Sequence, residues 1–377
     1  MDFEEQAAKP LLAAHGIAVP ASQLVETPEA AADAARAIGP CVVKAQVPTG
    51  KRGKAGGIRL AATPEEAAEA TRAILDLTID GWPVRRMLIE AQVPIARELY
   101  AAVLNDHAAR SPAVLFSTAG GMDVEEAAAA DPSAMRRITV PIGAGLTVAA
   151  TEDLLKDTDL GAAHGAVRDA LLALYRAYRA SDAELLEVNP LVVTREGAVV
   201  ALDCKLTLDD AAAPRQPDLA PAAAPERRTA LEARAAEAGL KYIELDGSVG
   251  VLANGAGLTM TSMDIIAHYG GRPANFLEIG GEAYTKATTA LGIVLDNPNV
   301  RSLLVNFCGA FARTDVMAEG VVRAWEELKP DIPVFFTIHG TGEEDAIKLV
   351  QDRLGITPFD LADDAVKAAV AAAEARA

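Results

Sequence analysis

Three side chains that carry oxygen, Glu187, Asn189 and Asp203, lie close together in the sequence between residues 185 and 205. Asn189 and Pro190 directly precede one apolar run, and Asp203 directly follows another. Carboxylate and amide oxygens are the protein ligands that Mg²⁺ prefers, often alongside the phosphates of a nucleotide. If the chain brings these positions together, the chemistry to expect is the binding of a divalent cation and a phosphorylated ligand.

The elements that position these residues are two β-prone runs, 191–193 and 199–202, on either side of Arg195, Glu196 and Gly197. This pattern predicts a β-hairpin. We expect Asn189 and Pro190 to end the ladder at the start of one strand and Asp203 to lie at the end of the other, so that both can share one cation. A plain hairpin with polar ends fits the spacing equally well.

A second stretch suited to phosphate chemistry is the strand predicted at 41–47, which carries Lys44, and the loop that follows it at 48–57. The loop holds four glycines and three basic residues. Glycines let backbone N–H groups approach an anion, and a lysine on a neighbouring strand binds phosphate as a point charge. The alternative is a solvated basic hairpin tip, because neither of the common glycine-rich phosphate motifs is matched.

Helical and extended patterns alternate along the rest of the chain. Helices are predicted at 3–15, after Thr27, after Thr63 and over 151–179, and two strands are predicted around a bend at Pro94. From residue 247 onward, strands followed by glycine turns and helices recur, with Thr314 or Asp315 as the expected cap of one helix. These patterns predict an α/β protein of more than one domain.

Composition limits the classes of function. The 377 residues are 51% hydrophobic and 4% aromatic, and the formal net charge of −18 argues against a nucleic-acid partner. The cysteines are scattered and odd in number, so no disulfide framework is expected. We found no apolar run long enough for a membrane span and no leader pattern, and we therefore expect a cytoplasmic protein without a membrane partner.

The run EVNPLVV, followed by ALDCK at 201–205, resembles the metal-binding hairpin of ATP-grasp enzymes, specifically the β subunit of succinyl-CoA synthetase. The similarity extends from about Phe3 to about Val366, and NGAGL and ANFLEIGG in the second half resemble the same family. The implied fold is α/β, with an ATP-grasp nucleotide-binding region (1–208), a linker and connecting helix (209–245), and a flavodoxin-like, doubly wound parallel-sheet CoA-ligase domain (246–377).

The resemblance also implies roles for particular residues. Asn189 and Asp203 would hold Mg²⁺, supported by Glu187. The residues expected to bind ATP are Lys44, Lys51, Arg52, Gly53, Glu90, Val93 and Glu98. In the second domain, Gly309 and Arg313 would take part in catalysis, and the acid would contact Asn254, Gly309, Ala310 and Phe311.

The implied activity is that of the β subunit of a heteromeric, ADP-forming acid–CoA ligase. Mg²⁺·ATP would phosphorylate a histidine of an α subunit, the phosphohistidine would activate a small carboxylic acid, and CoA, bound mostly by the partner, would displace phosphate. Two alternatives remain: a self-sufficient ATP-grasp carboxylate–amine ligase, and a non-catalytic nucleotide-binding subunit. Among this chain's own histidines, His339 is interpreted as a loop residue that binds backbone or partner.

One departure from the family concerns the acid. Succinate enzymes of the family usually read N-x-FGGI-x-R, where this chain has Ala310 in place of a glycine and Phe311 in place of an aliphatic residue, while Arg313 is retained. A misfit of one methylene costs about 1–3 kcal/mol of discrimination, so we expect an acid other than succinate. The alternative is that Phe311 turns into the core and leaves the pocket unchanged.

Overall fold

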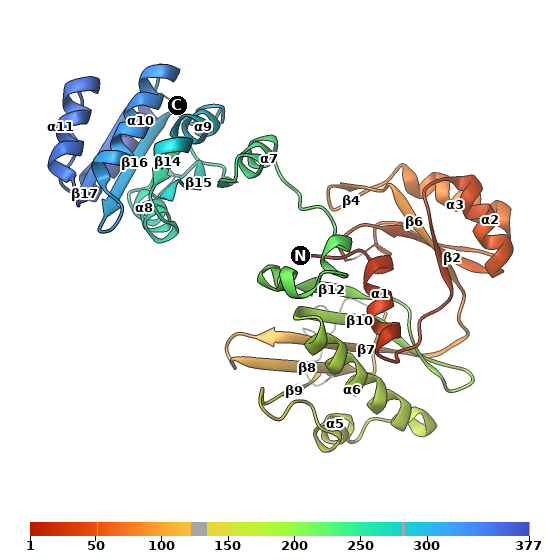
Figure 1. Cartoon of the computed structure of the whole chain (residues 1–377). Coiled ribbons are helices and arrows are strands. Elements are labelled where there is room, and N and C mark those ends of the chain that lie inside the picture. Colours follow the sequence, from red (N-terminus) through yellow and green to blue (C-terminus); the bar gives the residue numbers. More distant parts are fainter. Residues whose placement is uncertain (51, 122–133, 281–282, 377) are drawn as a thin grey trace. The chain divides into compact units, whose positions relative to one another are not determined.

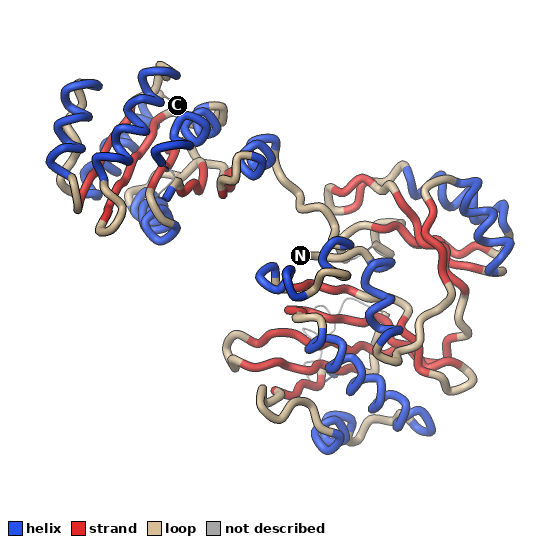
Figure 2. Tube along the Cα trace, in the orientation of Figure 1, coloured by secondary structure: helices blue, strands red, loops and turns tan. Residues whose placement is uncertain are grey.

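The computed structural model describes residues 1–50, 52–121, 134–280 and 283–376, and these divide into two compact units, 1–226 and 227–377 (Figure 1). Helices and strands alternate along both units (Figure 2), as predicted for an α/β protein. The segment 209–245 is divided between the units. Its first part packs onto unit 1, where Ala212 is buried and the Ala224 N–H donates to the Asp2 carbonyl at 2.8 Å. Its second part contains α7 (Ala230–Glu237) and β13 (Lys241–Glu244) of unit 2.

Unit 1 contains a four-stranded antiparallel sheet in the order β1-β6-β2-β3. Its strands are β1 (Ser22–Val25), β6 (Arg86–Ala91), β2 (Cys41–Gln46) and β3 (Ile58–Ala61). Two helices pack on one face, α2 (Pro28–Ile38) and α3 (Pro64–Leu75), and the Thr27 and Thr63 side chains cap them as predicted. β4 (Thr78–Ile79) and β5 (Trp82–Pro83) form a small separate ladder.

A larger sheet of unit 1 has the order β11-β10-β7-β8-β9, with β12 beside β10. Its strands are β7 (Ile95–Asp106), β8 (Ser111–Ser117), β9 (Arg136–Thr139), β10 (Ala183–Thr194), β11 (Val199–Ala201) and β12 (Lys205–Leu208). Two helices, α1 (Glu5–Ala14) and α6 (His164–Ala180), bury their apolar faces on it. The prediction of helical structure over 151–179 is confirmed in part: α5 (Val148–Leu155) ends before a turn in which Asp157 has a φ of 57°, and α6 begins a second helix at His164.

The hairpin prediction is confirmed in part. β10 and β11 pair antiparallel, with Leu191 opposite Ala201, but Asn189 and Pro190 do not end a strand. They form a bulge inside β10, where the register against β7 shifts between Val188 and Leu191. On its other edge β10 changes partner at the same place, from β12 to β11. Pro190 has no N–H to give to a ladder. Asp203 lies in the connection between β11 and β12, at the point where β10 changes from one to the other.

Unit 2 is a five-stranded, mostly parallel sheet in the order β13-β15-β14-β16-β17. The parallel strands are β14 (Val249–Ala253), β15 (Asn275–Glu278), β16 (Ser302–Gly309) and β17 (Val334–Gly340), and β13 runs antiparallel at one edge. One face is covered by α9 (Ala283–Leu295), α10 (Thr314–Leu328) and α11 (Glu343–Leu354), the other by α8 (Ala256–His268) and α12 (Ala362–Ala375). Helices on both faces confirm the doubly wound prediction.

Candidate nucleotide and acid sites

A cavity of about 680 Å³ opens in unit 1 between the two sheets. β2, the loop after it, the end of β6 and the bulge of β10 all contribute to its wall. The predicted site residues that line it are Lys44, Arg52, Gly53, Glu90, Val93, Asn189 and Asp203. Lys51 lies outside the described residues. The chain therefore brings together most of the positions to which the resemblance gave a nucleotide or metal role.

Glu98 is placed beside this group by a glycine. Gly121 has a φ of +71°, and a Cβ built on it would lie 1.9 Å from Glu98 Oε2. The Gly121 N–H donates to Asn189 Oδ1 at 2.8 Å, so this glycine connects a proposed nucleotide contact with a proposed metal ligand. Sequence reasoning gave Gly121 no role.

Lys44 is the buried cation at the centre of the site. Its side chain contacts Glu90 Oε1 at 2.6 Å and Glu5 Oε1 at 3.0 Å, and it donates to the Leu202 carbonyl. Burial alone would lower the pKa of Lys44, but the charges of Glu5, Glu90 and Asp203 outweigh burial and raise it. Lys44 is therefore a fixed positive charge at neutral pH, which is what an oxyanion of phosphate requires.

Glu90 lies deep in the wall. It is 1% exposed and forms ion pairs with Lys44 and Lys9, so its present partners are cations of this chain. Glu5 completes the group through Lys9 Nζ at 2.6 Å and Arg52 Nη2 at 2.8 Å. Burial raises the pKa of Glu5, but Lys44, Arg52 and Lys9 together hold it well below its usual range. Sequence reasoning missed Glu5 and Lys9, which belong to an otherwise ordinary amphipathic helix.

The side-chain atoms here that could coordinate a metal are oxygens. Asp203 accepts from Arg52 Nη2 at 2.6 Å and from the Cys204 N–H at 2.7 Å, while Glu187 Oε2 accepts from the Tyr100 hydroxyl at 3.1 Å. Within the described ranges, no group of three or more His, Cys, Asp or Glu forms a ready metal cage. A carboxylate and an amide oxygen on one cavity wall fit Mg²⁺, which commonly takes its remaining ligands from water and phosphate.

Part of the cavity wall is apolar, directly beside Lys44, because Ile58 lies opposite Lys44 and Leu60 opposite Val42 in the sheet. Val42, Ile58, Leu60, Val93 and Ile95 line it, and the exposed fractions of Ile58, Leu60 and Ile95 are 36%, 73% and 37%. Large aliphatic side chains left exposed at a cavity mouth indicate a site for a flat apolar ligand group. The cavity wall thus combines charged and apolar side chains, as a nucleotide requires.

In unit 2 the predicted acid-binding residues lie at the carboxyl ends of β14 and β16, the edge where doubly wound sheets bind ligands. Asn254 joins these two strand ends: its side chain donates to the Cys308 carbonyl and accepts from the Cys308 N–H, both at 2.8 Å. Asn254 therefore fixes the strand ends by its own amide. The parallel register supports this, because Ala253 lies opposite Asn306.

The turn between β16 and α10 is held by backbone contacts. The Thr341 N–H donates to the Gly309 carbonyl at 2.8 Å, and the Thr341 hydroxyl donates to the Ala310 carbonyl at 2.9 Å. A Cβ on Gly309 would lie 2.0 Å from the Ala312 carbonyl oxygen, so glycine is required there. The predicted cap is wrong, since Thr314 already lies inside α10 and its hydroxyl donates to the Thr341 carbonyl.

Two side chains of this turn differ in how far they are exposed to solvent. Arg313 pairs with Asp315 at 2.9 Å and is about half exposed. Phe311 is fully exposed, so the alternative in which its ring turns into the core is wrong. Nearby, His339 lies inside β17 opposite Cys308, so its predicted place in a loop is wrong. Its Nε2 lies 2.7 Å from the Asp360 carbonyl and its Nδ1 lies 3.8 Å from Glu343, in agreement with the predicted backbone contact.

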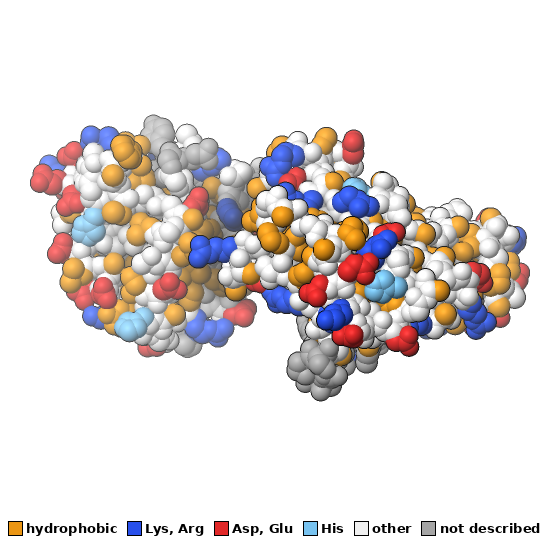
Figure 3. Space-filling model, turned by 90° about the horizontal axis from the view of Figure 1, so that it is seen from below, with side chains coloured by type: hydrophobic (Ala, Val, Ile, Leu, Met, Phe, Trp, Pro, Cys, Tyr) orange, Lys and Arg blue, Asp and Glu red, His pale blue; other side chains and the backbone are white. Residues whose placement is uncertain are grey.

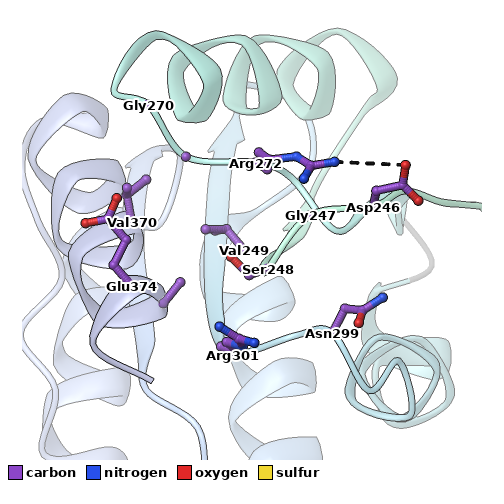
Figure 4. Close-up of a pocket in the computed structure, with 12 residues that line it drawn as sticks. Asp246, Gly247, Ser248, Val249, Gly270, Arg272, Asn299, Arg301, Val370 and Glu374 are labelled. Carbon is purple, nitrogen blue, oxygen red and sulfur yellow. Dashed lines mark ion pairs between the residues drawn. The ribbon is translucent and has the colours of Figure 1, made fainter. Parts of the chain in front are cut away.

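A second pocket of unit 2, of about 360 Å³, lies at the amino ends of β14 and β16 (Figure 4). Arg272 and Asp246 face each other across it at 3.9 Å, and Arg301, Asn299 and Glu374 also border it. Of the residues that the structure describes, none of the predicted site residues lines this pocket. It belongs to the opposite edge of the sheet from Asn254 and Gly309.

Fold and sites together define a class of protein, and family models give the same result: an ATP-grasp domain matches residues 2–193 and a CoA-ligase domain matches residues 252–372. The chain is 40% identical to the β subunit of GDP-forming succinate–CoA ligase of Thermus thermophilus, over 98% of both chains. It is 44% identical to the ADP-forming β subunit of Rubrobacter xylanophilus, over 93% of both. The chain belongs to the β-subunit family of succinate–CoA ligases.

A solved structure extends this similarity. The ATP citrate lyase of Methanothrix soehngenii, in complex with citrate and coenzyme A, superimposes with a TM-score of 0.74 at 26% identity, over 98% of this chain and 99% of that one. The ATP-grasp and CoA-ligase prediction is therefore confirmed, as is the prediction of an acid–thiol ligase β subunit. In the described parts of the chain, the helices are too short or too polar to cross a bilayer.

Proposed function

We propose that this chain binds Mg²⁺·ATP in the cavity of unit 1 and transfers the γ-phosphoryl group to a histidine of an α subunit, as the nucleotide-binding half of an acid–CoA ligase. The observation that carries the proposal is the convergence of Lys44, Arg52, Asn189 and Asp203 on one cavity. Phosphoryl transfer depends mainly on positioning and on neutralising charge, and this wall supplies both.

The charged and the apolar residues of the cavity bind different parts of the nucleotide in this proposal. Lys44, Arg52 and the backbone near Gly53 bind the phosphates, and Ile58, Leu60 and Ile95 enclose the base. Val93, which lines the cavity, and Glu98, which lies beside Gly121, would contact the base or the ribose. The charged side chains favour the phosphates, and the apolar side chains favour the base.

Asn189 and Asp203 would hold Mg²⁺, with Glu187 beside them. The metal supplies neutralisation of phosphate charge when bound. For its carboxylate to turn to the metal, Asp203 must leave Arg52, and Arg52 retains Glu5 at 2.8 Å. Arg52 thus stays held by Glu5 and by the Ala45 carbonyl, to which its Nη1 donates at 2.9 Å, while its charge acts on the phosphates.

The partner subunit and the acid belong to unit 2 in this proposal. The relatives are named as β subunits, which supports an α partner that carries the phosphorylated histidine and most of the CoA site. Gly309 and Arg313 would face the reaction, and Asn254, Ala310 and Phe311 the small carboxylic acid. A methyl group and a ring at 310 and 311 support an acid other than succinate. A cytoplasmic location stays a prediction.

The test is phosphoryl transfer with and without the partner. This chain is co-expressed with the α-like subunit of its own operon or genome and incubated with γ-labelled ATP and Mg²⁺. We expect an acid-labile label on the α subunit and none on this chain alone. A label on His339 of the isolated chain would overturn the division of labour. Transfer to an added amine acceptor would favour the carboxylate–amine ligase, and binding of ATP without transfer would favour a non-catalytic subunit.

A further inference from the structure

Helix α1 carries two charged side chains that have no role in the function proposed so far. Glu5 is 2% exposed and Lys9 is 4% exposed, and they pair with each other one turn apart at 2.6 Å. Ionised groups lose several kcal/mol of hydration when they are buried, so a pair inside a protein is weak evidence of a stabilising role. What these two residues touch indicates a different purpose.

Glu5 is the shared partner of three cations. One carboxylate contacts Lys9, Lys44 at 3.0 Å and Arg52 at 2.8 Å. Both cations that we propose for phosphate binding therefore depend on the same side chain. α1 brings Glu5 to β2 and to the loop after it, because the helix lies beside the strands that carry the site (Figure 1).

Lys9 contacts the other side of the site. It pairs with Glu90 and donates to the Leu202 carbonyl at 2.9 Å, the same carbonyl to which Lys44 donates. Leu202 directly precedes Asp203, the proposed metal ligand. Lys9 and Lys44 together therefore pin the backbone from which the Asp203 carboxylate extends.

We infer that Glu5 and Lys9 are positioning residues for phosphoryl transfer: Glu5 orients Lys44 and Arg52 toward the phosphates, and Lys9 fixes the chain at Asp203 and shares Glu90 with Lys44. This inference rests on the proposed function of the cavity. Neither residue lines the proposed nucleotide cavity. They act through Lys44, Arg52 and Asp203, as outer-shell partners act on the ligands of a metal.

The charges of the cluster around Glu5 and Lys9 balance, so the effect of removing either residue can be predicted. Lys9, Lys44 and Arg52 oppose Glu5, Glu90 and Asp203, so the cluster contains three cations and three carboxylates. Removal of Lys9 alone leaves one carboxylate in excess, and the Lys44 ammonium is then drawn toward Glu90 and away from the phosphates. Removal of Glu5 and Lys9 together keeps the balance but releases Lys44 and Arg52 from their orientation.

The experiment uses the assembled αβ complex with Lys9→Met, the conservative Lys9→Arg, and Lys367→Met as a matched control from an exposed pair of α12. We measure kcat and KM for ATP, and the affinity for Mn²⁺ with a non-hydrolysable ATP analogue by electron paramagnetic resonance. For Lys9→Met we expect kcat/KM and Mn²⁺ affinity to fall about 10- to 100-fold. Lys9→Arg should restore most of both, and Lys367→Met should leave both unchanged.

Because a lone change in a buried cluster can prevent folding, the charge-neutral double variant Glu5→Gln with Lys9→Met is measured as well. We expect it to assemble and still to bind Mn²⁺ and nucleotide about 10-fold or more weakly. Unchanged affinity in either folded variant, or failure of both to fold, overturns the inference. A wild-type complex that does not bind nucleotide overturns the proposed function instead, so the two failures are distinguishable.

Discussion

Asp203 has two kinds of partner in this chain, a backbone N–H and the Arg52 guanidinium. If it binds Mg²⁺, Asp203→Ala should lower kcat for phosphoryl transfer by about 100- to 1,000-fold, a loss typical of removing one preorganised electrostatic group. The fold should persist, because Arg52 keeps its contact with Glu5. The measurement is transfer of label to the α subunit, with Asp33→Ala, an exposed carboxylate of α2, as the control. Normal Mg²⁺-dependent turnover would contradict the metal assignment.

Gly121 offers a second test at the level of one residue. Its φ of +71° already disfavours a side chain, and an added Cβ would strike Glu98 Oε2. Gly121→Ala should therefore lose about 1–2 kcal/mol of stability through its backbone and should also weaken ATP binding by displacing Glu98. The control is Gly197→Ala, where φ is +84° but no atom lies within 4 Å. Equal ATP affinity in the two variants would remove Glu98 and Gly121 from the site.

Helix α1 links local charge to the stability of the whole unit. Lys44, Arg52 and Lys9 hold the pKa of Glu5 well below its ordinary value despite burial. A carboxylate with a lowered folded pKa contributes stability above its unfolded pKa, about 4.3, and loses it as the pH falls toward the folded pKa. The free energy of unfolding of unit 1 should thus decrease below about pH 4.3.

Urea denaturation at a series of pH values measures this dependence. Glu5→Gln should flatten the decrease, since the variant has no proton to gain at that position, and Glu69→Gln on the exposed face of α3 should retain it. A wild-type slope in the Glu5→Gln variant would show that the acid sensitivity arises elsewhere.

The turn after β16 is the element that should set the acid. Phe311 is fully exposed and Ala310 is exposed beside it, so neither is required for packing. Ala310→Gly with Phe311→Ile should shift preference toward succinate by about 1–3 kcal/mol in kcat/KM. The assay is kcat/KM of the assembled complex over succinate, malate, acetate and longer or substituted acids. If succinate is already the best acid of the unchanged complex, these two residues do not determine selectivity.

Most individual helices and strands could be predicted from the sequence. Periodicity, threonine caps and glycine turns predicted most strands and helices, because these signals are local. The role of Asn189 and Pro190 was misjudged, because a proline after a polar residue reads as a strand end, whereas the sheet absorbs it as a bulge. Glu5 and Lys9 were missed for a related reason: only the packing of α1 against another sheet turns an ordinary helical ion pair into part of a site.

At the scale of the molecule, all described residues that line the proposed nucleotide cavity lie in unit 1. Acidic and basic side chains are interspersed on the face shown in Figure 3, in keeping with a ligand recognised by a local cluster and not by a large charged surface. A ligand that binds only the folded form stabilises it by about 2.7 kcal/mol at 100 times its Kd.

Hydrogen exchange read by mass spectrometry tests this localisation. A non-hydrolysable Mg²⁺·ATP analogue should slow exchange in β2, the loop after it and residues 187–205, and leave α8 and β17 of unit 2 unchanged in the isolated chain. Incubation with the analogue but without Mg²⁺ is the control, and it should protect residues 187–205 less. Protection confined to unit 2 would place the nucleotide elsewhere.

The turn of residues 309–313 has a consequence for how this family diversifies. Its backbone is tied to Thr341, and Cys308 just before it is tied to Asn254, by contacts that do not involve the side chains of Ala310 or Phe311. Exposed substitutions outside such contacts usually change stability by no more than about 0.5 kcal/mol. If this turn contacts the acid as proposed, one or two codon changes here should alter the acid preference without loss of folded protein, which makes the segment a place to begin directed evolution toward other acyl-CoA products.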